Sequence, residues 1–180
     1  MGGIKMEEFD ISNRLISRVE ERELIMERIF EAPRELVFRA FSEPKHLVSW
    51  WGPRGWETTN YTFGFKPDGV WHYCMQCTDK NQGEFYGQKL WGKSIYHEID
   101  VPEKIVYTDI FSDEKGNISD NMPGNLVTLT FLEYKRKTKF VMRYQLGSSQ
   151  SPEEIRDSGF VHGLDSSFNR LDEFLNKENM

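Results

Sequence analysis

The middle of the chain alternates apolar and polar residues in short runs separated by turn residues, a pattern typical of antiparallel β-strands. A first strand is predicted over 23–31 and six more over 57–63, 70–77, 85–100, 105–111, 125–134 and 137–146. The turn over 66–69 reads Lys-Pro-Asp-Gly. Its proline presets φ and its glycine accepts a positive φ. Short connections of this kind favour antiparallel pairing of consecutive strands.

Helical periodicity brackets this run of strands. Two short helices are predicted to begin at Pro33 and Pro44, because proline is well accommodated in a first helical turn. The longest helix comes last, over 151–176, where Ser-Pro-Glu-Glu supplies a cap, a first-position proline and acids on the helix dipole. We expect a pause near Gly159. The apolar stripe of this helix consists of Leu164, Phe168, Leu171 and Leu175.

Residues 1–20 precede the first predicted strand as an N-terminal arm. Apolar residues between 6 and 20 fall on one side of a helical wheel, which predicts an amphipathic helix there. Two partners are open for its apolar face, the arm's own domain or a second copy in a homodimer, and we favour the first. The remainder, 21–178, is predicted to form one domain.

This order of elements indicates an α+β fold. We expect a curved antiparallel sheet of about six to seven strands wrapped around the long C-terminal helix, with two short helices after the first strand. A sheet with one buried face needs a cover, and the last helix is available for it. Such an arrangement leaves space between sheet and helix, which is where a ligand could bind.

Composition narrows the range of functions. The 180 residues are 38% hydrophobic and 29% charged, as in a soluble globular protein. A net charge of -6 speaks against nucleic acid and anionic membranes as partners, because both require basic patches. There is no apolar run of the length of a membrane span and no apolar N-terminal signal, so we expect a cytoplasmic location.

Six segments in order resemble one known family. They are Arg28 to Phe38, Glu43-Pro44, Trp50 to Pro53, Pro67 to Trp71, Pro102 to Thr108 and Leu126 to Phe131. With the terminal helix, they resemble the helix-grip superfamily, also called SRPBCC or START-like. Within it the chain resembles the family named for the activator of the heat-shock-protein-ninety ATPase, over roughly 21–175.

The resemblance implies a helix-grip fold that encloses a cavity for an apolar ligand, in a superfamily of lipid carriers, cyclases and hydrolases. The family often carries a tryptophan after the glycine of the last helix, whereas here Gly163 is followed by Leu164. Two outcomes are open at this position, a larger cavity or a repacked core.

Strand alternation identifies candidate cavity residues, because every second side chain shares a face. The larger apolar sets on 70–77 and 137–146 are assigned inward, together with residues from the tryptophan-rich segment and the last helix. The predicted ligand-binding residues are Trp51, Trp71, Tyr73, Met75, His97, Phe140, Met142, Tyr144 and Phe168.

Candidates for chemistry are few. His97 shares a predicted face with apolar residues, and an imidazole there is either a satisfied core group or a general base, with Asp109 as a conceivable partner. Cys74 and Cys77 are spaced C-x-x-C, but in a strand they point to opposite faces about 10 Å apart, too far for a disulfide. We predict free thiols, no metal site and no cofactor.

Three functions follow as hypotheses. The first is binding of a small hydrophobic or aromatic molecule in an internal cavity, without assigned catalytic residues. The second is a cyclase- or hydrolase-type enzyme that uses the same cavity and needs a histidine–carboxylate pair inside it. The third is an accessory activator of the heat-shock-protein-ninety ATPase, which we rank last, because in the eukaryotic activator that role involves a second domain.

Overall fold

The computed structural model describes residues 14–118, 123–147 and 150–179. These residues form one antiparallel sheet of eight strands in the order β1-β2-β8-β7-β6-β5-β4-β3. The strands are β1 (Ile16–Glu20), β2 (Glu23–Phe30), β3 (Trp56–Phe63), β4 (Val70–Cys77), β5 (Lys89–Asp100), β6 (Lys104–Phe111), β7 (Asn125–Tyr134) and β8 (Lys137–Gln145). The predicted α+β fold is therefore confirmed, with one strand more than expected.

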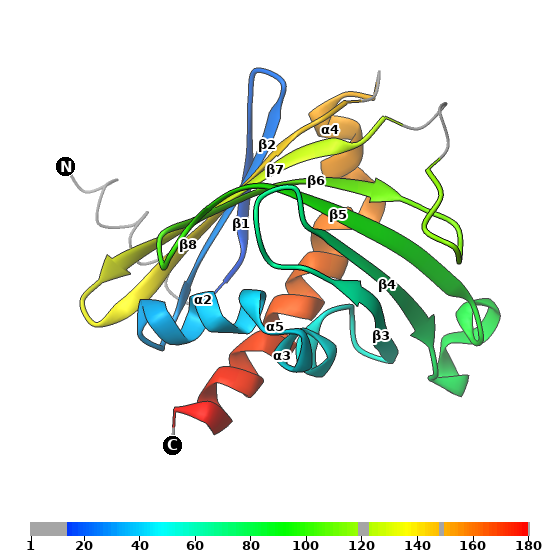
Figure 1. The fold of residues 1–180 in the computed structure, drawn as a ribbon, viewed down its shortest axis with the longest axis horizontal. Coiled ribbons are helices and arrows are strands. Elements are labelled where there is room, and N and C mark those ends of the chain that lie inside the picture. The colour runs from blue at the N-terminus through cyan, green and yellow to red at the C-terminus, as the bar shows by residue number, and fades with distance from the viewer. Residues whose placement is uncertain (1–13, 119–122, 148–149, 180) are drawn as a thin grey trace.

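The sheet curves around a long C-terminal helix, α5 (Val161–Glu178), which crosses its concave face (Figure 1). Phe168, Leu171 and Leu175 of α5 are at most 2% exposed, because this stripe packs against the sheet. None of the helices within the described ranges combines the length and the hydrophobicity that a membrane-spanning helix requires.

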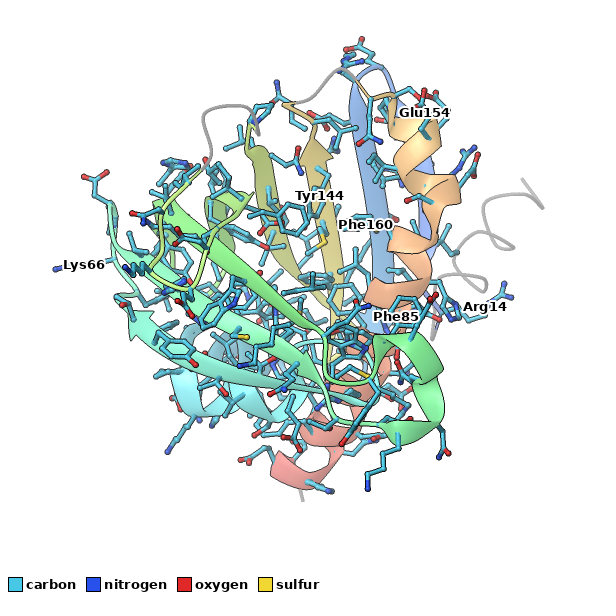
Figure 2. All side chains as sticks on the ribbon, turned by 90° about the vertical axis from the view of Figure 1, so that its right-hand side faces the viewer. Arg14, Lys66, Phe85, Tyr144, Glu154 and Phe160 are labelled. Atoms are coloured by element: carbon cyan, nitrogen blue, oxygen red, sulfur yellow. The ribbon has the colours of Figure 1, made fainter. Side chains whose placement is uncertain are left out.

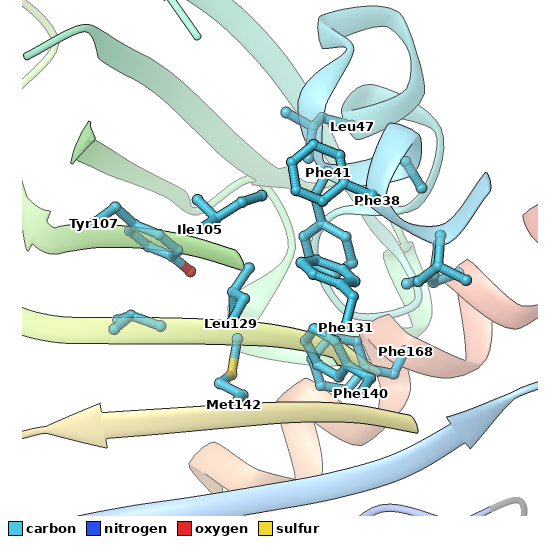
Figure 3. Close-up of a cluster of buried hydrophobic side chains, with 14 of the residues drawn as sticks. Phe38, Phe41, Leu47, Ile105, Tyr107, Leu129, Phe131, Phe140, Met142 and Phe168 are labelled. Carbon is cyan, nitrogen blue, oxygen red and sulfur yellow. The ribbon is translucent and has the colours of Figure 1, made fainter. Parts of the chain in front are cut away.

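Two short helices, α2 (Arg34–Ser42) and α3 (Pro44–Trp50), pack beside α5 on the same side of the sheet (Figure 1). Aromatic rings supply several of their core contacts. The ring of Phe41 stacks on Phe140 at 5.2 Å, and Phe140 meets Phe168 edge-on at 5.3 Å, so the helices are joined to the sheet through phenylalanines (Figure 3).

The N-terminal arm differs from its prediction where the structure describes it. Residues 16–20 form the edge strand β1, paired with β2 through a tight turn in which Glu21 adopts a φ of 53°. The predicted helix over 6–20 is thus wrong for 16–20, and its part before residue 14 lies outside the described residues. Through this pairing, residues 16–20 of the predicted arm form part of the same sheet as the strands that follow.

The last helical region is broken at the predicted place. A short α4 (Pro152–Ile155) leads into a π-helical turn, η2 (Arg156–Phe160), in which Gly159 has a φ of 94°. Only glycine adopts this conformation without strain. Earlier in the chain, residues 80–85 form a 3₁₀ segment, η1 (Lys80–Phe85). The strand β5 therefore begins at Lys89 and not at residue 85 as predicted.

Candidate functional site

A cavity of about 560 Å³ lies between the concave face of the sheet, the η2–α5 region and the segment after α3. Its volume is within the range of small-molecule sites, about 300–1,000 Å³. The described lining is mainly apolar and aromatic. It includes Trp50, Trp51, Tyr73, Met75, Met142, Tyr144, Phe160, Leu164 and Phe168.

The tryptophan pair builds one wall. Trp50 ends α3 and donates its indole N–H to the carbonyl of Ala40 at 3.0 Å, which satisfies its polar atom inside the core. Trp51 follows in extended conformation and packs edge-on against Trp71 and Tyr73, at centroid distances of 4.8 and 5.8 Å. The wall therefore connects α3 to strand β4.

Arg170 of α5 fixes the segment behind this wall. Its Nη1 lies 2.7 Å from the carbonyl oxygen of Gly52, 3.1 Å from that of Trp56, and within 3.4 Å of those of Trp51 and Pro53. Burial lowers the pKa of Arg170, which remains far above neutral as arginines do. One cation thus holds four backbone carbonyls of the cavity wall onto the helix.

We expect Arg170→Met to lower the free energy of unfolding by about 2–3 kcal/mol, because buried carbonyls lose a charged donor. Urea denaturation measures this loss. The control is Arg54→Met, which removes the ion pair to Glu173 between the same segments; both partners there are more than half exposed, so the loss should stay below about 1 kcal/mol. Equal losses in both variants would contradict the role given to Arg170.

Asp109 is the polar centre of the cavity. It lies on β6 on the same face as Tyr107, opposite Asn125 of β7, and it accepts a hydrogen bond from the hydroxyl of Tyr144 at 3.1 Å. Asp109 is half-buried, because one side faces the cavity. Among the described lining residues it is the only Asp, Glu, Lys, Arg or His.

The surroundings of Asp109 shift several pKa values. Burial raises the pKa of Asp109 to about 6, against the opposing effect of the hydrogen bond from Tyr144. Burial, and secondly the charge of Asp109, raise the pKa values of Tyr73, Tyr107 and Tyr144 well above the usual value, so these phenols stay neutral. At neutral pH the described lining of the cavity therefore carries one negative charge, beside neutral hydroxyls.

Gly92 of β5 allows the ring of Tyr73 to lie against the sheet. A Cβ at this glycine would come 2.4–2.9 Å from Tyr73 ring and hydroxyl atoms. No real Cβ contact is that short, so a side chain at position 92 would push the ring out of its place. The glycine thereby sets the position of one cavity-lining tyrosine.

The cavity opens to solvent between the strand ends and η2. Leu90 and Phe111 line it and yet are 41% and 59% exposed, as residues at a rim are. In Figure 2, Tyr144 lies on the sheet and Phe160 on the neighbouring helical segment. The two rings meet edge-on at 5.0 Å.

The structure brings most of the predicted site residues together. The cavity lining contains Trp51, Tyr73, Met75, Met142, Tyr144 and Phe168. Trp71 and Phe140 are corrections, because both are buried behind the wall rather than in it. Trp71 donates its indole N–H to Asn60 at 2.9 Å and supports Trp51, while Phe140 supports Phe168.

The placement of His97 in the cavity is wrong. Its side chain is exposed and its Nε2 lies 2.6 Å from the hydroxyl of Thr108. A bulge shifts the register of β5 against β6 between Tyr96 and Glu98, so that Tyr96 and Ile99 pack on the core while His97 faces outward. Unbroken alternation, which grouped His97 with Ile99, does not hold across a bulge.

Asp109 enters the predicted site only as a partner of His97, and Phe160 is not among the predicted lining residues. The sequence does indicate that Asp109 faces inward, because it shares a strand face with Ile105 and Tyr107. Phe160 lies in the π-helical turn, and the spacing of apolar residues does not predict the position of such a turn.

The two cysteines are free thiols on opposite faces of β4. Burial raises the pKa of Cys74, which makes its reactive thiolate form scarcer. In the described part of the chain, no group of three or more His, Cys, Asp or Glu side chains is arranged to hold a metal ion.

Solved structures with similar folds come from several bacteria. A protein from Staphylococcus epidermidis is 26% identical with a TM-score of 0.78, over 90% of this chain and 94% of that one. Protein Ms6760 from Mycobacterium smegmatis is 24% identical with a TM-score of 0.75, over 89% and 94%. A protein from Arthrobacter aurescens is 23% identical with a TM-score of 0.77, over 91% of each chain.

The sequence itself matches a family model over residues 31–176, described as Activator of Hsp90 ATPase homolog 1-like protein. No match was found among the curated protein sequences. Since the matched region spans most of the sequence and includes the walls of the cavity, this chain belongs to the Activator of Hsp90 ATPase homolog 1-like family.

Proposed function

We propose that this protein binds a small apolar or aromatic molecule in the cavity between sheet and helix. The observation that carries the proposal is the cavity itself, about 560 Å³ in volume and lined mainly by aromatic and aliphatic side chains. Binding there removes apolar ligand surface from water, worth about 25 cal/mol per Å² before the costs of association. Methionines in the lining, Met75 and Met142, can adapt their shape to the ligand.

The enzyme alternative required a histidine–carboxylate pair inside the cavity. His97 and Asp109 do not form one, because His97 is exposed on the outer face while Asp109 faces the cavity. Binding is therefore the function that the observed arrangement supports better than acid–base chemistry.

A neutral apolar fluorophore, N-phenyl-1-naphthylamine, tests the proposal. Titration should give a dissociation constant in the micromolar range, about -8 kcal/mol. Transfer of excitation from tryptophan would show that the probe lies close to the indoles, three of which, Trp50, Trp51 and Trp91, line the cavity. Absence of saturable binding at probe concentrations up to its solubility would overturn the proposal.

We expect Leu164→Trp to weaken binding of this probe at least tenfold. Leu164 lines the cavity and is half-buried, so a larger side chain there occupies ligand space at little cost to the core. The matched control is Leu132→Trp, the same exchange at a side chain of β7 that is 43% exposed outside the cavity. An unchanged affinity in Leu164→Trp, in a variant that unfolds at the wild-type urea concentration, would contradict the assigned site.

A further inference from the structure

The half-buried carboxylate of Asp109 has few hydrogen-bond partners for a charge drawn away from bulk water. A carboxylate can accept about four hydrogen bonds, and within the described residues the donor to Asp109 is the hydroxyl of Tyr144. Buried charges in proteins are normally paired with an opposite charge or a metal ion. No described lysine, arginine or histidine lines the cavity, so the described residues supply no such partner there.

Asp109 borders the space that a ligand would fill. The cavity reaches Asp109 itself and its cross-strand neighbour Asn125. A group of the ligand placed there would contact the carboxylate directly. The chemistry that satisfies it is a hydrogen-bond donor with a positive charge, since a charge-assisted bond is about twice as strong as a neutral one.

The rings around this position favour a cation as well. Tyr73, Tyr144 and Trp51 all line the cavity, and the face of an aromatic ring attracts an ammonium group within about 6 Å of its centroid. A ligand with a carboxylate would instead bring a second negative charge beside Asp109. Among ligands of equal apolar size, these groups favour a positive charge over a negative one.

We propose that the preferred ligand is an apolar molecule carrying one protonated amine, whose ammonium group pairs with Asp109 while its apolar part lies among the aromatic side chains. This inference rests on the proposed function, since it assumes that the cavity is the ligand site. It adds the chemical class of the ligand and the residue that selects it.

Three probes with one skeleton test the proposal: 4-phenylbutylamine, 4-phenylbutan-1-ol and 4-phenylbutyrate. Isothermal titration calorimetry at pH 7.5 compares their affinities for the wild-type protein. The amine should bind at least tenfold more tightly than the alcohol, and the carboxylate more weakly than the alcohol. Equal affinities for amine and alcohol would overturn the inference.

The variant Asp109→Asn removes the charge while keeping the size of the side chain and an acceptor for Tyr144. It should lose the preference for the amine, with at least a tenfold drop in amine affinity and less than a threefold change for the alcohol. The matched control is Asp100→Asn, which removes one exposed carboxylate at the end of β5 and should leave all three affinities unchanged.

Failure of this inference is distinguishable from failure of the proposed function. If N-phenyl-1-naphthylamine binds but the amine has no advantage, or keeps its advantage in Asp109→Asn, the cavity is a ligand site that does not select cations. If neither that fluorophore nor any of the three probes binds, the proposed function fails as well. The comparison within the wild-type protein decides the question independently of how the variant folds.

Discussion

A chain that ends at Ser158 should not fold cooperatively. The truncation removes α5, whose side chains Phe168, Leu171 and Leu175 are buried against the sheet. Burying each is worth about 1.5–3 kcal/mol, so the three together account for a large share of a typical total stability of about 5–15 kcal/mol. The truncation also removes the hydrogen bonds from Arg170 to the cavity wall and exposes the concave face of the sheet.

Circular dichroism and urea denaturation would test this expectation. The truncated chain should lack a cooperative unfolding transition. The control is a chain that ends at Asn176. It keeps Leu175, and the described residues that it removes, 177–179, are exposed. Its free energy of unfolding should therefore change by less than about 1 kcal/mol. A sigmoidal transition of normal steepness in the shorter chain would show that the sheet does not depend on the helix.

Asp109→Asn should stabilise the protein, and the gain should grow as the pH rises. Asp109 has a pKa of about 6 in the folded state against an ordinary 3.8. Between these values the folded state binds more protons than the unfolded state, so wild-type stability falls as the pH increases. Well above pH 6, the ionised Asp109 lowers the free energy of unfolding by its full amount, which is about 3 kcal/mol for the difference between the two pKa values.

Urea denaturation of both proteins across pH 4.5–7.5 measures this effect. The advantage of Asp109→Asn should increase by about 2 kcal/mol over that range, from about 1 to about 3 kcal/mol. The tyrosines around Asp109 do not titrate there, because burial raises their pKa values further from neutrality. A constant difference between the two proteins at every pH would contradict the raised pKa.

The variant Tyr144→Phe tests the pKa of Asp109 a second time, by removing its hydrogen-bond donor and leaving the carboxyl group in place. The hydrogen bond from Tyr144 lowers the pKa of Asp109, so its loss should raise that pKa above 6 and extend the falling part of the stability profile to higher pH. A carboxylate kept in the cavity at such a cost to stability is typical of residues retained for binding.

Much of the fold is readable from local pattern. The limits predicted for the third strand, 70–77, are those of β4 (Val70–Cys77), because Asp68-Gly69 ends a turn and alternation begins directly after it. The helix starts at Pro33 and Pro44 agree with α2 and α3 within a residue. Turn chemistry and side-chain periodicity act over a few residues, so a linear sequence displays them fully.

The predictions from local pattern are wrong where a second structure fits the same pattern of apolar residues equally well. Leu15, Ile16 and Val19 suit one face of a helix, yet 16–20 pairs with β2 and gains backbone hydrogen bonds along the sheet edge. His97 was misplaced for a related reason, since the bulge beside it arises from pairing between β5 and β6 and leaves no mark in the spacing of apolar residues.

For the candidate site, the sequence by itself determined which side chains face inward on β4 and β8, because alternation has a fixed period of two. Tyr73, Met75, Met142 and Tyr144 follow from it. Only the tertiary structure decided that Asp109 meets Tyr144, 35 residues further along the chain, and that Arg170 holds the carbonyl of Gly52, 118 residues before it. Such contacts depend on strand register, sheet curvature and helix position, which result from packing of the whole chain and not from any short segment.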